Sequence, residues 1–217
     1  EPLVAKSLKL LEDSVQPDGG IYKSGSRLKN YDTCLAIVCL QEANRDRRFD
    51  KMIANADKFV RGMQVDEQDG KEKSDFSYGG ATYGGQGRPD LSNTTFLIEA
   101  LKSAGAGPDD EAMRKALAFV SRCQNLETEH NATPYAAKNP DGGFYYTCAA
   151  DPGDDDKVPG GGLRSYGSMT YAGLKSMIFA GVKRDDPRVK AAVAWIQKNY
   201  DLKSNPGQGP AGLYYYY

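Results

Sequence analysis

Residues 161–181 read GGLRSYGSMTYAGLKSMIFAG, a glycine-rich turn that leads into an apolar segment of helix length. Lys175 is the single charged residue between Gly167 and Val182. A helix that is apolar on nearly all sides is typically buried on all sides. Glycine is unfavourable inside a helix, so Gly167 and Gly173 indicate a close backbone approach or a tight turn at the start. The pattern predicts a buried helix here.

Two further apolar segments, 33–40 and 93–101, resemble this one when the chain is aligned with itself. An amphipathic segment follows each of the three, at 49–64, 112–124 and 186–200, and another helix is expected at 2–15. The aligned triplets are Thr33/Thr94/Thr170, Leu40/Leu101/Met177, Ala43/Ala104/Ala180, Ala56/Ala116/Ala192, Phe59/Phe119/Trp195 and Val60/Val120/Ile196. The repetition predicts an array of helical hairpins, in which one helix of each pair is buried and its partner faces solvent.

Such hairpins can stack as an open solenoid or close into a double ring. Solenoid repeats of paired helices usually span about 34 to 47 residues. The units here are longer, because their connecting segments are long and rich in glycine and tyrosine. Inner helices that are apolar on all faces favour the closed ring. We therefore expect an all-α toroid in a single domain over residues 1–217, incomplete at one or both ends and part of a longer chain.

Composition and charge narrow the classes of function. The 28 basic and 29 acidic residues give a net charge of -1, so the chain lacks the excess of positive charge that favours binding to nucleic acid. No run of 18 apolar residues predicts a membrane span. The start at Glu1 fits a trimmed chain, or an exported or periplasmic protein after removal of its signal peptide. The four cysteines form no CxxC pair, which favours buried thiols over a disulfide framework. No cofactor is expected.

The turns between the helices carry a recognisable motif. Residues 16–20 read QPDGG and residues 139–145 read NPDGGFY, each followed by a polar or glycine-rich stretch and a threonine-containing apolar helix. This pattern resembles the repeat of squalene/hopene cyclases and protein prenyltransferase β-subunits, most closely at 141–145 and 165–174. The resemblance covers residues 3–217 and implies an α/α toroid. Tyrosines occupy the places where the cyclase repeat has tryptophan, namely Tyr22, Tyr78, Tyr145 and Tyr214.

The catalytic motifs of the two families are matched only in fragments. The cyclases protonate an alkene with an Asp-x-Asp-Asp motif, and its one echo here is Asp154, Asp155 and Asp156 in a Gly/Pro-rich segment. These are the candidate catalytic acids. A proton donor needs a carboxyl that burial and a neighbour keep neutral. Adjacent acids beside glycine and proline are more typical of a solvated surface loop.

A zinc site is suggested by an equally partial match. Prenyltransferase β-subunits hold zinc with Asp-x-Cys and a distant histidine, and Asp32 and Cys34 match the first part. His130, the sole histidine, lies in a connecting segment instead of at the start of an inner helix. We therefore interpret Asp32 as a helix N-cap and Cys34 as a buried thiol, with zinc as the alternative.

Tyrosines are concentrated in the connecting segments and at the starts of the inner helices, where a toroid would place them around one mouth of the barrel. Tyrosine offers a large, rigid contact area with a polar tip, which suits binding sites. The alternative is that the rings close the barrel end and satisfy the turn backbone. The candidate ligand-binding residues are Tyr78, Tyr83, Tyr145, Tyr146, Tyr166 and Tyr171.

Two functions follow from these patterns. The first is a non-catalytic toroid domain that binds an apolar small molecule, a peptide or a glycan at its tyrosine-rich mouth. The second is a cyclase-like or prenyltransferase-like enzyme whose catalytic residues lie partly outside this chain. The first is favoured, because neither family's catalytic set is matched residue by residue.

Overall fold

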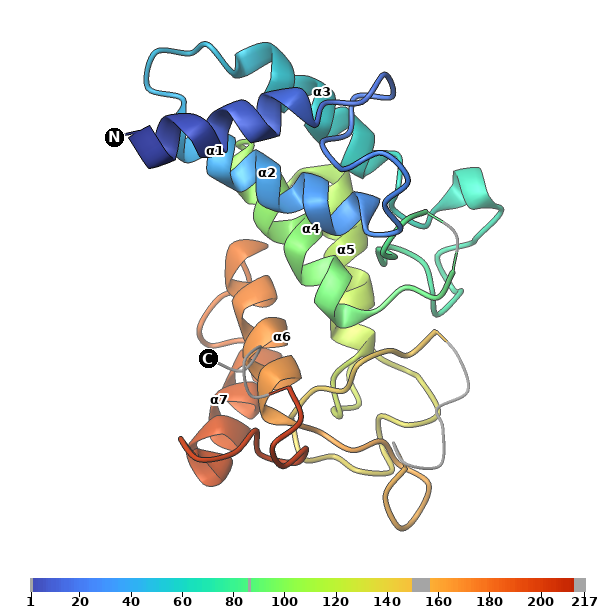
Figure 1. Ribbon diagram of the computed structural model, residues 1–217. Coiled ribbons are helices and arrows are strands. Elements are labelled where there is room, and N and C mark those ends of the chain that lie inside the picture. Colours follow the sequence, from blue (N-terminus) through green and yellow to red (C-terminus); the bar gives the residue numbers. More distant parts are fainter. Residues whose placement is uncertain (1, 86, 150–156, 213–217) are drawn as a thin grey trace.

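The computed structural model describes residues 2–85, 87–149 and 157–212 (Figure 1). This part of the chain is all-helical and contains isolated β-bridges but no strand, which confirms the prediction of an all-α protein. None of its helices is long and apolar enough to cross a bilayer. The elements are α1 (Pro2–Asp13), α2 (Lys29–Ala43), α3 (Asp50–Arg61), the 3₁₀ helix η1 (Glu67–Asp69), α4 (Leu91–Ser103), α5 (Glu111–Arg122), α6 (Gly167–Phe179) and α7 (Pro187–Asn199).

The apolar helices form an inner row in which α4 packs against both α2 and α6. Each amphipathic helix packs on the inner helix that precedes it, so that α3, α5 and α7 cover α2, α4 and α6 from the outer side. The long connecting segments gather at the starts of the inner helices, to the right and lower right in Figure 1. The structure thus confirms the predicted hairpin pairs.

Burial along the inner row depends on the number of neighbours. Nine of the thirteen residues of α4 are buried, because α4 has an inner helix on each side. Leu35 in α2 is 37% exposed and Ile178 in α6 is 56% exposed. Among the described helices, α2 and α6 each have only one inner neighbour. The expectation of burial on all sides is therefore correct for α4 and wrong for the other two.

The threonines aligned in the sequence make the same hydrogen bonds in all three units. Each hydroxyl accepts from the backbone N–H that follows the Gly-Gly pair and donates to the carbonyl four residues earlier in the chain. The accepted bonds are Ile21 N to Thr33 Oγ1 at 3.0 Å, Ala81 N to Thr94 Oγ1 at 3.0 Å and Phe144 N to Thr170 Oγ1 at 3.1 Å. The donated bonds go to the carbonyls of Lys29, Asp90 and Tyr166. The predicted register of the repeat is correct at these positions.

The first glycine of each pair lets its turn lie directly on the next outer helix. Gly79 has φ +84°, and a Cβ atom there would lie 1.9 Å from the Lys115 carbonyl oxygen of α5. A side chain is therefore excluded by the backbone angle and by the contact. Equivalent Cβ atoms in the other two turns would lie 3.0 Å from the oxygen of Asn55 in α3 and 2.8 Å from that of Ala191 in α7.

One predicted helix cap is wrong. Helix α2 begins at Lys29, and its N-cap residue Leu28 provides no side-chain hydrogen bond. Asp32 lies inside the first turn, where it accepts a hydrogen bond of 2.9 Å from Ser26 Oγ. The helix can begin earlier because the Tyr83 carbonyl, from the next unit, accepts from the N–H of Asn30 at 3.0 Å.

Candidate functional site

The six predicted tyrosines differ in burial. Tyr78, Tyr145 and Tyr166 are buried. The hydroxyl of Tyr78 donates to Glu67 Oε1 at 2.8 Å, and that of Tyr145 donates to the carbonyl of Arg122. Tyr78 and Tyr145 contact α5, and Tyr166 is the N-cap residue of α6. All three have little surface to offer a ligand, so we leave them out of the candidate site.

Tyr83 and Tyr146 are the pair that reaches the surface. They follow the Gly-Gly turns of consecutive units, and their hydroxyl oxygens lie 3.2 Å apart. Tyr83 is 42% exposed, whereas Tyr146 is half-buried. Their carbonyls accept from the first turns of α2 and α4, at Asn30 N (3.0 Å) and Leu91 N (2.8 Å). The pair therefore bridges the starts of two neighbouring inner helices.

A buried carboxylate lies behind this pair. Asp90, the N-cap residue of α4, is only 2% exposed. Its Oδ1 accepts from Asn93 N at 2.9 Å and its Oδ2 from Asn93 Nδ2 at 2.8 Å. The Tyr146 hydroxyl lies near this carboxylate and lowers its pKa. Asp90, Tyr146 and Tyr83 extend from the interior to the surface, and we call them the tyrosine–aspartate site.

The electrostatics of the site follow from burial. Burial raises the pKa of Asp90, although hydrogen bonds from Asn93, the nearby Tyr146 hydroxyl and the charge of Arg88 act in the opposite direction. Burial also raises the pKa of Tyr146, and the neighbouring Asp90 charge raises it further. Tyr146 therefore keeps its proton at physiological pH. Tyr83 is the member of the site that lies at the surface.

Further aromatic rings lie on the inner helices. Tyr31 of α2 and Phe96 of α4 are half-buried and meet edge to face, with ring centroids 4.6 Å apart. Tyr171, the sixth predicted tyrosine, is half-buried near the start of α6. The arrangement combines ring faces with hydroxyl groups, which is suited to holding a ligand by stacking and hydrogen bonding.

The predicted zinc ligands do not form a metal site with other described residues. Cys34 is fully buried, and its thiol lies 3.5 Å from Asn30 Oδ1. Burial raises the pKa of this thiol, which opposes the thiolate form that zinc requires. Within residues 2–85, 87–149 and 157–212, no three His, Cys, Asp or Glu side chains are placed to share a metal ion. Asp154, Asp155 and Asp156 lie outside the described residues.

Sequence reasoning missed Asp90. The signal was present, because an aspartate directly before an apolar helix is a typical N-cap. What the sequence does not show is the burial of this carboxylate or its proximity to Tyr146, 56 positions away. Both depend on how the third unit packs against the second.

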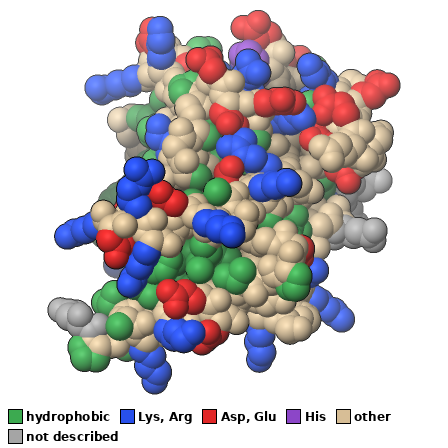
Figure 2. All heavy atoms as spheres, turned by 90° about the horizontal axis from the view of Figure 1, so that it is seen from above, with side chains coloured by type: hydrophobic (Ala, Val, Ile, Leu, Met, Phe, Trp, Pro, Cys, Tyr) green, Lys and Arg blue, Asp and Glu red, His purple; other side chains and the backbone are tan. Residues whose placement is uncertain are grey.

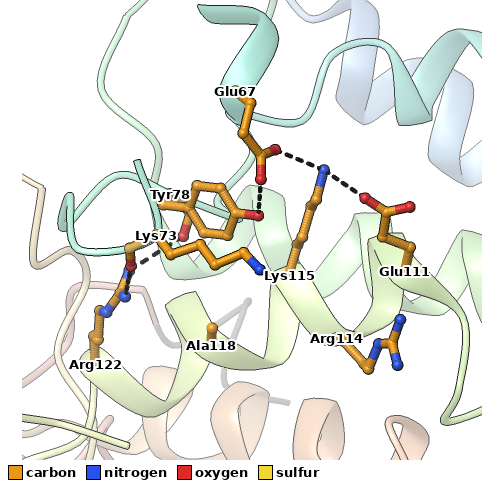
Figure 3. A pocket seen from close by; sticks show the side chains of 8 residues that line it. All are labelled: Glu67, Lys73, Tyr78, Glu111, Arg114, Lys115, Ala118 and Arg122. Carbon is orange, nitrogen blue, oxygen red and sulfur yellow. Dashed lines mark hydrogen bonds and ion pairs between the residues drawn. The ribbon is translucent and has the colours of Figure 1, made fainter. Parts of the chain in front are cut away.

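A separate hollow of about 620 Å³ lies on the outer side of α5, beneath the segment that carries η1 (Figure 3). Tyr78 is the only predicted residue that lines it. The lining residues are Glu67, Lys73, Tyr78, Glu111, Arg114, Lys115, Ala118 and Arg122, which we call the outer hollow.

No family model matches the chain, and no curated protein matches it at a significant level.

Proposed function

We propose that this chain is a ligand-binding helical-repeat domain that binds its ligand at the tyrosine–aspartate site. The observation that carries the proposal is the hydrogen bond between exposed Tyr83 and Tyr146, with the buried carboxylate of Asp90 behind it. Tyr146 is half-buried and holds the Tyr83 hydroxyl through this bond. A preorganised surface hydroxyl loses little conformational freedom on binding, which favours affinity.

We also propose that the helical array is an arc of an α/α toroid, as the resemblance to squalene/hopene cyclases and prenyltransferase β-subunits implies. The support is the order of packing, with a single inner row covered on one side by outer helices. In a closed ring the starts of the inner helices would surround one mouth. The tyrosine–aspartate site would then lie on the rim of that mouth.

A glycan is the ligand class that best fits these groups. Sugar rings stack on aromatic faces, and their hydroxyl groups both donate and accept hydrogen bonds, as the Tyr83 hydroxyl does. A peptide or an apolar small molecule would use the rings without requiring the hydroxyl pair. The three classes therefore differ in how much binding should depend on the two hydroxyl groups.

The test is a binding measurement by isothermal titration with cellotetraose, farnesol and a neutral tetrapeptide as probes. Binding of the glycan that weakens about tenfold in both Tyr83→Phe and Tyr146→Phe supports the proposal. Tyr200→Phe is the matched control, because Tyr200 is an exposed tyrosine on the outer side. Equal weakening in the control, or no binding of any probe, would overturn the proposal.

A second candidate function is proton-transfer catalysis of the cyclase or prenyltransferase kind. The observation that favours it is Asp90, a buried carboxyl whose raised pKa and tyrosine neighbour suit a proton donor. Turnover assays with squalene and prenyl diphosphates, together with zinc analysis, distinguish the two. Product that is formed by the wild type and lost in Asp90→Asn would establish catalysis, and the absence of product would favour binding alone.

A further inference from the structure

The outer hollow distributes its charges unevenly. Lys115 forms ion pairs with three carboxylates, with its Nζ 2.9 Å from Asp66, 3.0 Å from Glu67 and 3.0 Å from Glu111. Its ammonium is largely buried, and the three acids neutralise it more than fully. The three carboxylates offset the desolvation cost of the Lys115 ammonium, so its burial does not require a bound ligand.

The other cations of the hollow have no carboxylate partner. Lys73 and Arg114 are exposed, and within the described residues neither has an acidic oxygen within 4.0 Å. Arg122 donates only to backbone oxygens, those of Lys73, Asp75 and Tyr78. Three positive groups therefore face the hollow while its negative groups are already engaged.

The hollow is also shaped in a defined way. Arg122 holds the backbone of Lys73, and Figure 3 shows the Lys73 side chain extending across the hollow past Tyr78. A volume of about 620 Å³ is far larger than a single small anion requires and lies in the range of short peptides and drug-sized ligands. The side of the molecule seen in Figure 2 carries both signs of charge interspersed. The net charge of the chain is -1, so any recognition of an anion at the hollow is local.

The same position in the preceding unit has a hollow but lacks the charged wall. It measures about 460 Å³ and lies between the turn at 15–19 and α3. Only three residues separate Val15 from Gly19 there, whereas fourteen separate Gln64 from Gly79, and Gln64 is the equivalent of Val15 because both form the β-bridge that closes the turn. The longer segment of the second unit carries Glu67 and Lys73. The charged wall is therefore an addition to a hollow that recurs in the repeat.

We propose that the outer hollow is a second binding site, which takes a short peptide segment carrying acidic side chains. The carboxylates of the peptide pair with Lys73, Arg114 and the outward face of Arg122, and its backbone lies over Ala118. Charge-assisted pairs of this kind give specificity for the acidic side chain and steer the encounter. The site is independent of the tyrosine–aspartate site.

Fluorescence polarisation of a labelled Gly-Glu-Ala-Glu-Gly-Glu peptide tests the proposal, with a glutamine-substituted peptide as the matched probe. We expect saturable binding of the acidic peptide that weakens as salt is raised from 50 to 300 mM, and about tenfold weaker binding of the neutral one. Tyr83→Phe should leave both affinities unchanged, which separates this result from the test of the tyrosine–aspartate site.

Charge reversal locates the binding. Lys73→Glu with Arg114→Glu should weaken binding of the acidic peptide at least tenfold, whereas Arg45→Glu with Lys51→Glu, the same charge change at exposed sites outside the hollow, should alter it less than twofold. If the reversed variant does not fold, Lys73→Gln with Arg114→Gln provides the measurement. Equal loss in the control, equal affinity for the two peptides, or displacement by an equal concentration of inorganic phosphate would overturn the proposal.

Discussion

Asp90 and Glu67 are carboxylates of the same repeat unit, and their surroundings shift their pKa values in opposite directions. Asp90 lies at the start of the inner helix α4, where burial outweighs its hydrogen bonds and raises its pKa. Glu67 lies on the outer side, where its own backbone N–H, Lys115 and Tyr78 lower its pKa to about 2. The inner side of the repeat is thus controlled by desolvation and the outer side by pairing.

This difference has a structural origin. The inner row is held by uncharged contacts, such as the threonine hydrogen bonds that all three units share. The ionic network around Lys115 belongs to one unit, because two of its three acids, Asp66 and Glu67, come from the long segment after α3. The shared contacts define the fold, and the individual ones define the two candidate sites.

The largest effect on stability is expected at Gly79, where the turn before the inner helix α4 contacts the outer helix α5. Gly79→Ala should reduce the free energy of unfolding by about 3 to 5 kcal/mol, because the new Cβ meets the backbone of α5 and the residue is held at positive φ. Gly70→Ala is the control: it has φ +71° but open space around it, so its cost should be about 1 kcal/mol. Urea unfolding of both variants measures the difference, and equal costs would refute the packing argument.

On the inner side, Asp90→Ala should cost about 2 to 4 kcal/mol, because it removes the cap of α4 and leaves the buried Asn93 side chain without its acceptor. Asp90→Asn keeps a capping oxygen and should cost less. The raised pKa means that the folded state binds the proton more tightly than the unfolded state. Lowering the pH towards 4 should therefore raise the free energy of unfolding of the wild type relative to that of Asp90→Asn, as measured by urea unfolding. A pH-independent difference would contradict the raised pKa.

On the outer side, the sign is reversed. The pKa of Glu67 is lowered from 4.5 to about 2, so its contribution to stability is present above pH 4.5 and is lost as the pH falls through about 2. Glu67→Gln should show a shallower loss of stability over this interval. Thermal unfolding of the two proteins between pH 5 and pH 2 measures it. Parallel curves would show that Glu67 is not paired in solution.

The smallest effect concerns the thiols and leaves stability unchanged. Cys39 is exposed in α2, whereas Cys34, Cys123 and Cys148 are buried. One thiol should react rapidly with Ellman's reagent in the folded protein and four after denaturation, and Cys39→Ser should abolish the rapid reaction. Two or more rapidly reacting thiols in the native protein would mean that the inner row opens readily.

The sequence was sufficient to predict the repeat, because its determinants are local or recur in register. Thr33, Thr94 and Thr170 align by sequence and make equivalent hydrogen bonds in the structure. The second glycines of the three turns likewise lie against the aligned aromatic residues Phe59, Phe119 and Trp195. Because the same pattern occurs in three units, each unit supports the assignment of the others, and the helix pairs could be predicted.

The candidate sites were harder to predict from the sequence. Tyr78 and Tyr146 occupy similar connecting segments, yet one ring is buried beside α5 and the other reaches the surface side. That distinction depends on the neighbouring unit. At the outer hollow, Lys115 pairs with Asp66, which lies 49 positions earlier in the chain, and no spacing pattern in the sequence indicates this pair.

The central claim is that ligand binds beside Tyr83 and Tyr146. The most direct measurement is an NMR titration of the chain with ¹³C-labelled tyrosine, in which the two resonances are assigned with Tyr83→Phe and Tyr146→Phe. We predict that adding cellotetraose shifts these two resonances saturably and leaves those of buried Tyr78 and Tyr145 in place. Saturable shifts confined to Tyr200, or unchanged spectra at millimolar glycan, would contradict the account.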